Sequence, residues 1–425
     1  MSTNKFFFWF WVVYLPACIL FYDRMWQTID EAMTVVLFLF TVMKVYGKRI
    51  DSIGKEILWY IVLMVFYVAY SIVLKINVQE AVFYDLQQQV RPYVVFFCSY
   101  LIAPQFTEKQ KKRLIRWFVF CIFLYLTSFI IGFRVSKFGL STPMIGQAAL
   151  LTAAMYLLFK DNTRKNVLRG ILILSLGLLS MKSKFFGEYI VFIGLFYFLR
   201  SRLKPNLKTI LSILALTSAI VYFTWEKFDA YYVTGMTEEV KSSERKARPE
   251  SFKTAGTIIF SDYIPLGSGL ASFGTNAAAK YYSPLYYKYH LDNIWGLYPE
   301  NPMFLADAFY PTLAQYGLVG LFFFLWFWIR RYKQALHHKE FRAYKVAMMM
   351  IFALFLENMA DTSYLSGKGM GYFMLLAMAI KGSYVNKKKV ILISNDKLND
   401  DDNDNDDGKP LSNSPEGKGI SENGK

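Results

Sequence analysis

Charged residues of both signs stand at one end of several long apolar runs in this sequence. Lys184 and Glu188 are four residues apart, so a helix would place them on the same face. Asp307 begins another apolar run, and Glu357 and Asp361 end a third with the same spacing. Charges below the level of lipid headgroups are costly and usually serve a function. Together, such residues could line a polar cavity suited to ionic chemistry.

Each cation taken singly has a simpler interpretation. Long Lys and Arg side chains at the ends of membrane helices often reach out to lipid headgroups, and Lys137 and Lys182 fit this description. Glu188 and Asp307, however, gain nothing from anionic headgroups. The two carboxylates therefore favour a shared polar cavity over a set of separate anchors.

The apolar runs that carry these charges are typical of membrane-spanning helices. Of the 425 residues, 55% are hydrophobic, which is more than a soluble domain usually contains. Backbone groups in lipid must bond within their own segment, so such runs form helices. We therefore expect an all-α polytopic membrane protein with about twelve transmembrane helices. The expected spans are Phe6–Tyr22, Thr28–Met43, Ile57–Leu74, Pro92–Ala103, Leu114–Phe133, Pro143–Phe159, Leu168–Met181, Phe185–Leu199, Ile210–Trp225, Phe304–Ile329, Tyr344–Asn358 and Met370–Ile380.

The distribution of Lys and Arg predicts which side of the membrane each link faces. The even-numbered short links hold four to six of these residues each, and the odd-numbered short links hold one or two. Because Lys and Arg in short loops favour the cytoplasm, both termini are expected there. The charged helix ends and the long ninth link would then face outward.

This long link divides the predicted chain. We expect helices one to nine in residues 5–225, an outward (periplasmic) loop in 226–303, and helices ten to twelve in 304–385. Within the loop, Glu250–Phe260 has a helical pattern and Pro265–Gly269 a turn pattern. Residues 386–425 are rich in Asn and Asp and are expected to be a disordered cytoplasmic tail.

Several functional classes are disfavoured by what the sequence contains. Cys18, Cys98 and Cys121 lie within predicted spans and show no metal-ligand spacing with the three His residues. The run Gly267–Gly269 lacks the Lys of a phosphate-binding loop. The net charge of +16 is explained by topology and contact with membrane lipids. We therefore expect no metal, no cofactor and no nucleic-acid partner.

Four short motifs follow one another in the second half of the chain. They are Arg248-Pro-Glu-Ser-Phe252, Pro265-Leu-Gly-Ser-Gly269 with Phe273, Asp307-Ala-Phe-Tyr310 and Gln315-Tyr-Gly317-Leu-Val-Gly320-Leu. This order resembles the O-antigen polymerase and O-antigen ligase superfamily of bacterial surface-polysaccharide assembly, and Ser183-Lys184 lies where that family tends to carry Ser-Arg. The predicted topology is also similar, with about a dozen helices and one dominant outward loop late in the chain.

The resemblance implies a membrane-embedded, metal-independent glycosyltransferase with a GT-C-like fold in the bacterial inner membrane. It would transfer a glycan from undecaprenyl pyrophosphate to another lipid-linked repeat unit, with a chain-length regulator and a flippase as possible partners. A pyrophosphate leaving group needs fixed cations, and the acceptor hydroxyl needs a base. The catalytic candidates are Asp307, Arg248 and Glu188, with Asp307 the first choice of base; the pyrophosphate-binding candidates are Arg91, Arg134, Lys184 and Arg245.

Two alternatives stay open. Ligases of the superfamily usually have His-Asn where this chain has Asp307-Ala308, which favours a repeat-unit polymerase over a ligase acting on an outer-core lipid acceptor. A transporter of lipid-linked glycans or small solutes is the alternative from another class. Such transporters commonly carry charges near the middle of their spans, and this sequence shows none there.

Overall fold

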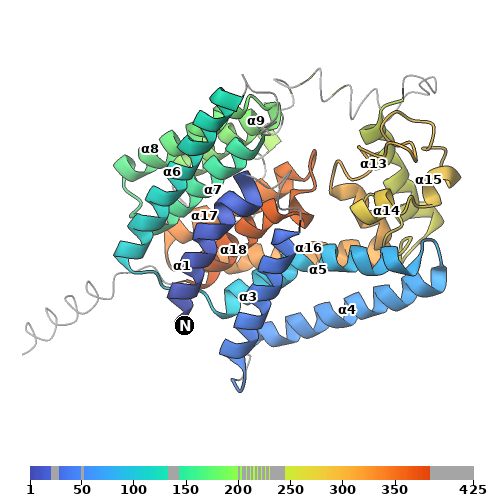
Figure 1. Ribbon diagram of the computed structural model, residues 1–425, viewed down its shortest axis with the longest axis horizontal. Helices are drawn as coiled ribbons and strands as arrows, with labels where there is room; N and C mark the ends of the chain where they lie inside the picture. Colours follow the sequence, from blue (N-terminus) through green and yellow to red (C-terminus); the bar gives the residue numbers. More distant parts are fainter. Residues whose placement is uncertain are drawn as a thin grey trace, which may run out of the picture. The chain divides into compact units, whose positions relative to one another are not determined.

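Helices dominate the computed structural model, and no β-sheet forms among the residues it describes (Figure 1). These are residues 1–20, 28–48, 52–132, 143–199 and 245–382, with nine single positions between 202 and 229. They all belong to one unit, Met1–Gly382. The predicted all-α class is confirmed for this part of the chain. The predicted C-terminal tail and most of the ninth span lie outside the described residues.

The first eight predicted spans correspond to helices in the structure. These helices are α1 (Thr3–Tyr14), α3 (Ile29–Val45), α4 (Ser52–Leu74), α5 (Gln79–Leu101), α6 (Glu108–Gly132), α7 (Pro143–Phe159), α8 (Arg164–Ser175) and α9 (Ser183–Ile193). The predicted bounds of α7 are those observed. Helix α5 begins at Gln79, well before the predicted start at Pro92. Its first half was not predicted as part of a span because it carries polar residues, such as Asp85 and Gln89, which are buried against protein.

The second half of the chain contains the loop helices and the last three long helices. These are α13 (Ala247–Thr257), α14 (Asn276–Lys280), α15 (Leu285–Lys288), α16 (Gly317–Leu336), α17 (Phe341–Glu357) and α18 (Gly367–Lys381). The predicted start of the tenth span at Phe304 is wrong. The apolar run there is interrupted by Pro311, and residues 304–316 form turns and the short 3-10 helix η6 (Tyr310–Gln315) before α16 begins.

Helix α18 is the most buried long helix of the C-terminal half, with every side chain from Met370 to Ile380 inside. It packs on α5, α7 and α17, and in Figure 1 α17 and α18 lie among α1, α7 and α16. An apolar helix surrounded by other helices needs no polar face. Its N-terminal end is therefore the part that can take part in polar chemistry.

Helix length and apolar composition bear on how many of the predicted spans can cross a membrane. Among the described residues, two helical segments are long and apolar enough to cross a membrane, Thr3–Leu20 and Ile53–Leu74. Helix α4 exposes large apolar side chains along its length, including Leu58, Val62 and Val65, as a helix facing lipid does. The count of twelve spans stays a prediction.

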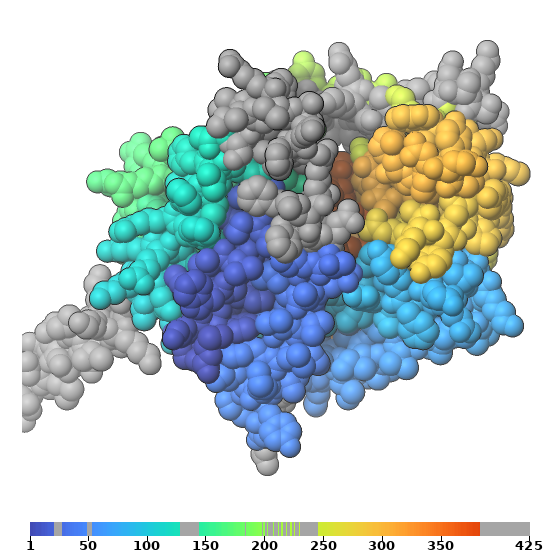
Figure 2. Space-filling view, viewed as in Figure 1, coloured from blue at the N-terminus to red at the C-terminus, as the bar shows by residue number. Residues whose placement is uncertain are grey.

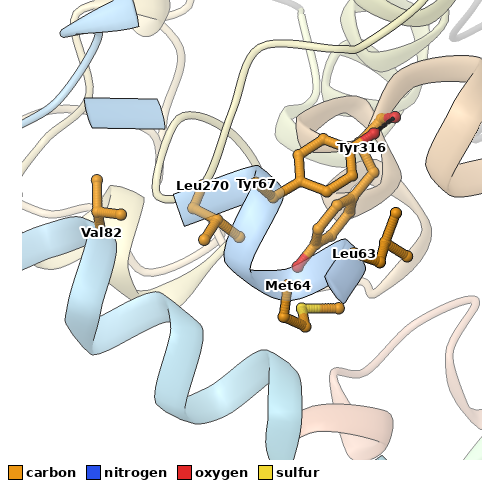
Figure 3. Close-up of a cluster of buried hydrophobic side chains, with 6 residues drawn as sticks. All are labelled: Leu63, Met64, Tyr67, Val82, Leu270 and Tyr316. Carbon is orange, nitrogen blue, oxygen red and sulfur yellow. Dashed lines mark hydrogen bonds between the residues drawn. The ribbon is translucent and has the colours of Figure 1, made fainter. Parts of the chain in front are cut away.

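The loop before α16 rests on the C-terminal half of α4 and the N-terminal half of α5. Leu270 lies against Tyr67 and Val82 in a buried cluster that also holds Tyr316 (Figure 3). The Tyr67 hydroxyl donates to the Tyr316 carbonyl at 2.6 Å. In Figure 2 the surface of this loop lies directly on that of α5. A rigid pair of helices therefore fixes the position of the loop.

Two of the motifs singled out from sequence are bonded to each other through their backbones. Ser268 N–H donates to the Ala314 carbonyl at 3.0 Å, and Gly269 N–H donates to the Gln315 carbonyl at 2.9 Å. At Gly267, where φ is +79°, a Cβ atom would lie 2.3 Å from the nitrogen of Gly317. The glycines of the motif thus serve a close backbone approach.

We expect Gly267→Ala to destabilise the protein strongly. The positive φ alone costs about 1–2 kcal/mol for an L side chain, and the methyl group would also meet backbone atoms that cannot move aside. Gly256→Ala is the matched control, because a Cβ atom there meets nothing within 4 Å in helix α13. The apparent melting temperature in detergent should fall for the first variant and stay level or rise for the second. Equal melting temperatures would refute the role of the close approach.

Candidate functional site

Lys184, in the first turn of α9, is held by two carboxylates at the end of α17. Its Nζ donates to Glu357 Oε2 at 2.5 Å and to Asp361 Oδ2 at 3.2 Å. Glu357 is the last residue of α17, and Asp361 lies in the turn that follows. The two carboxylates, noticed in the sequence for their spacing of four residues, thus meet on one ammonium group.

Glu357 is the most heavily bonded of these carboxylates. Its Oε2 also accepts a hydrogen bond from Gln147 Nε2 of α7 and one from the Ser363 hydroxyl, both at 3.2 Å. The side chain is buried. A buried carboxylate is tolerated when it is paired and hydrogen-bonded. Glu357 therefore ties α7, α9 and the turn after α17 to a single oxygen atom.

Asp361 binds a second cation, Lys368, which lies at the start of α18. The two groups are 3.4 Å apart, and the other oxygen of Asp361 accepts the N–H of Thr362 at 2.8 Å. Burial by itself would raise the pKa of Asp361, but the ammonium groups of Lys368 and Lys184 lower the pKa to about 2. Asp361 is therefore an anion throughout the physiological pH range.

Arg248 and Asp307 form the more open part of the site. The Arg248 guanidinium donates to Asp307 Oδ2, which joins α13 of the loop to the turns before η6. Their side chains are 22% and 27% exposed, so a solute can reach both. The N–H of Phe309, two residues after Asp307, donates to the carbonyl of Asn358 at 3.1 Å. This contact joins the segment of Asp307 to the turn that carries Asp361, and the Arg248–Asp307 pair and the ion pairs of Lys184 are together called the charged cluster.

Glu188 lies one turn deeper in α9 than Lys184 and is only 1% exposed. Neither of its carboxyl oxygens accepts a hydrogen bond from a described residue. The hydroxyl of Tyr372 in α18 is buried and likewise has no hydrogen-bond partner among the described residues. A buried polar group without a hydrogen bond is costly unless it is protonated or bonded to a water molecule or a ligand.

The structure brings four of the predicted site residues together and separates others. Arg248, Asp307, Lys184 and Glu188 belong to the cluster just described. Arg245 binds Glu250 at 2.7 Å and the carbonyl of His290 at 3.1 Å. Arg134 lies outside the described residues. Their predicted roles in pyrophosphate binding stay predictions.

Arg91 is buried in an ion pair of its own. Its guanidinium binds Asp30 and, at 3.2 Å, Glu31, both in the first turn of α3, and donates to the Leu365 carbonyl at 3.0 Å. A buried Arg with two carboxylate partners supports packing between helices. Through Leu365, this pair also steadies the turn that carries Asp361.

Sequence reasoning did not assign a role in the site to Glu357, Asp361 or Lys368. The spacing of the two carboxylates was a usable signal, because i,i+4 acids at a helix end face the same side. Lys368 had a weaker signal: it is the single basic residue in the eleventh link, which is predicted to face outward, within the glycine-rich run Ser366–Gly371. Its proximity to Lys184 depends on helix packing and could not be read from the sequence.

The tyrosine cluster of the loop, residues 281–289, is largely part of a small core. Tyr286 is buried and stacks on Phe273 with ring centroids 5.1 Å apart, and Tyr282 donates to the Leu297 carbonyl. Tyr287 and Trp295 remain exposed. Exposed Tyr and Trp rings can stack on sugars or anchor at a membrane interface. These two rings are accessible for either role.

A separate apolar groove of about 1110 Å³ lies between α3, α4 and α5. Its walls include Phe38, Ile61, Met64 and Phe97. Tyr93 also lines it, and the hydroxyl of Tyr93 accepts a hydrogen bond from Tyr364, in the turn after α17, at 3.0 Å. A groove with these walls suits a hydrocarbon chain.

Within the described part of the chain, no three His, Cys, Asp or Glu side chains are arranged to hold a metal ion. No known family model matches the sequence, and no curated protein matches it.

We expect Glu357→Leu to lower the free energy of unfolding by about 1–3 kcal/mol, because it removes one of the two carboxylate partners of Lys184 and the charged acceptor of Gln147. Adding Lys184→Met should restore part of this loss, since the charge that lost a partner is then removed. Asp262→Asn is the control: its pair with Lys288 is exposed and should contribute at most about 1 kcal/mol. Denaturation in mixed detergent micelles would compare the wild type, Glu357→Leu, Lys184→Met, the double variant and this control. Simple additivity of the two cluster substitutions would contradict the pairing.

Proposed function

We propose that this protein is a surface-polysaccharide polymerase of the bacterial inner membrane. It transfers a glycan chain from undecaprenyl pyrophosphate to the terminal hydroxyl of another lipid-linked repeat unit on the outer face. One observation carries the proposal. Arg248 pairs with Asp307, the segment after Asp307 is bonded to Asn358 in the turn that carries Asp361, and Asp361 binds Lys184, which lies one helical turn before Glu188 in α9.

The cations of the cluster suit a pyrophosphate leaving group. As the bond from sugar to pyrophosphate breaks, negative charge grows on the departing oxygen, and fixed cations lower the energy of that state. Arg248 offers a planar donor group that matches phosphate geometry. Lys184, in the first turn of α9, supplies a second, compact charge.

The carboxylates suit the acceptor. The hydroxyl oxygen of the acceptor sugar attacks the anomeric carbon, its proton passes to a carboxylate, and undecaprenyl pyrophosphate leaves with the bonding electron pair. Asp307 is the better base of the two candidates because 27% of its side chain is exposed. Glu188 is buried, so a sugar hydroxyl reaches it only if the cluster opens.

A lipid-linked donor also requires a place for its hydrocarbon chain. The apolar groove between α3, α4 and α5 supports this requirement, because Tyr93 connects its wall with the turn that carries Asp361 through Tyr364. The proposal includes a GT-C-like arrangement of about twelve membrane helices, cytoplasmic termini, and a periplasmic loop that contributes Arg248. Asp307-Ala308 in place of His-Asn favours the polymerase over the ligase.

Arg248→Ala should abolish long polymer while single repeat units are still made. Losing one preorganised charge at the leaving group typically lowers the rate about 10²–10³-fold. Asp307→Asn should lower it about 10²–10⁴-fold through loss of the base. The assay uses purified protein and lipid-linked repeat units in proteoliposomes, with chain length read on gels.

Two substitutions in the same loop serve as controls for this assay. Lys253→Ala removes an exposed cation from α13, and Asp262→Asn removes an exposed carboxylate; both should leave chain length unchanged. Wild-type polymer from Asp307→Asn would transfer the role of base to Glu188. Transfer to a core-lipid acceptor but not to repeat units would identify a ligase instead.

The loop should be accessible from the periplasm. A cysteine in place of the exposed Ser261 should react with a membrane-impermeant maleimide in intact spheroplasts, whereas one in place of Lys109 should react only after lysis. The native Cys18, Cys98 and Cys121 are buried and give little background. Labelling of the Lys109 position alone in intact spheroplasts would invert the proposed topology.

A further inference from the structure

Two ammonium groups from different helices converge on one oxygen atom of Asp361. Lys184 Nζ of α9 lies 3.2 Å from Oδ2, and Lys368 Nζ of α18 lies 3.4 Å from the same atom. The other oxygen, Oδ1, is bound by the N–H of Thr362. One carboxylate oxygen thus lies between two cations, and the backbone orients its carboxylate.

We propose that Asp361 Oδ2 takes the place of a phosphate oxygen, and that Lys184 and Lys368 together form a binding site for the pyrophosphate of the donor. The inference deepens the proposed function and rests on it. When pyrophosphate binds, its oxygens replace Asp361 between the two ammonium groups. Lys368 is then a substrate-binding residue, and Asp361 competes with pyrophosphate for the two ammonium groups.

The charges favour this exchange. A single carboxylate oxygen gives each lysine one shared acceptor, whereas a pyrophosphate offers several oxygens and more negative charge. Lys184 keeps Glu357 as a second partner, so it stays in position when Asp361 is displaced. Lys368 is in the first turn of α18, where the helix dipole also attracts an anion.

Accessibility supports the same assignment. Asp361 is 21% exposed, while Glu357, which holds Lys184 from the other side, is buried. The partner that faces solvent is therefore the one that can be replaced. Glu188 faces the same charges with both oxygens lacking a hydrogen bond, so the cluster does not satisfy all of its own polar groups.

Binding of inorganic pyrophosphate and of geranylgeranyl pyrophosphate to the purified full-length protein tests the exchange. Asp361→Asn should tighten binding by roughly tenfold, since a competing charge-assisted contact is removed. Lys368→Met should weaken it by a similar factor, and Lys368→Arg should retain it. Asp262→Asn, which removes a carboxylate from the exposed pair with Lys288, should change nothing.

Weaker binding by Asp361→Asn would overturn the proposal, because Asp361 would then be a residue that positions the two lysines. Unchanged binding by Lys368→Met would overturn it as well. This second variant keeps the contact between Asp361 and Lys184, so it tests the proposal even if Asp361→Asn does not fold. Polymer assays on the same proteins separate the two levels. If the variants bind pyrophosphate as expected but the wild-type protein forms no polymer, the proposed function alone is refuted. If the wild-type protein forms polymer but the substitutions do not change pyrophosphate affinity, this inference alone is refuted.

Discussion

The turn from Asn358 to Ser366 is the point on which the other parts of the site depend. Lys184 of α9 binds its Asp361, Gln147 of α7 donates to its Ser363, and Arg91 of α5 donates to the carbonyl of its Leu365. Polar groups surrounded by apolar helices must find partners within the protein. A short turn that supplies many partners can therefore hold several helices in register.

The loop before α16 reaches the cluster through the same turn. The N–H of Phe309 donates to the Asn358 carbonyl at 3.1 Å, and the Phe309 ring stacks on Tyr364 with centroids 4.3 Å apart. These contacts fix the segment that carries Asp307. The middle of the loop is fixed on α4 and α5 through Leu270, and α13 precedes both of these contacts in the sequence.

Much of the helical framework was predictable because apolar runs leave little choice of secondary structure. Helix α7 has its predicted bounds, and the helical pattern in Glu250–Phe260 corresponds closely to α13. The errors occur where burial and hydropathy disagree. Helix α5 buries Asp85 and Gln89 against protein, so its polar half looked like a link, and the apolar run at Phe304 is divided by turns that a hydropathy count does not register.

Local composition and spacing were sufficient to predict the all-α class and to identify the residues with the chemistry to act. They also predicted that Glu357 and Asp361 share a helix face, since four residues make about one helical turn. The packing of the helices was needed to show that Arg91 is occupied by Asp30 and Glu31, that the glycines of residues 265–269 serve backbone contact, and that Lys368 shares an oxygen with Lys184. These contacts join residues far apart in the chain, and their distances are set by how the helices pack.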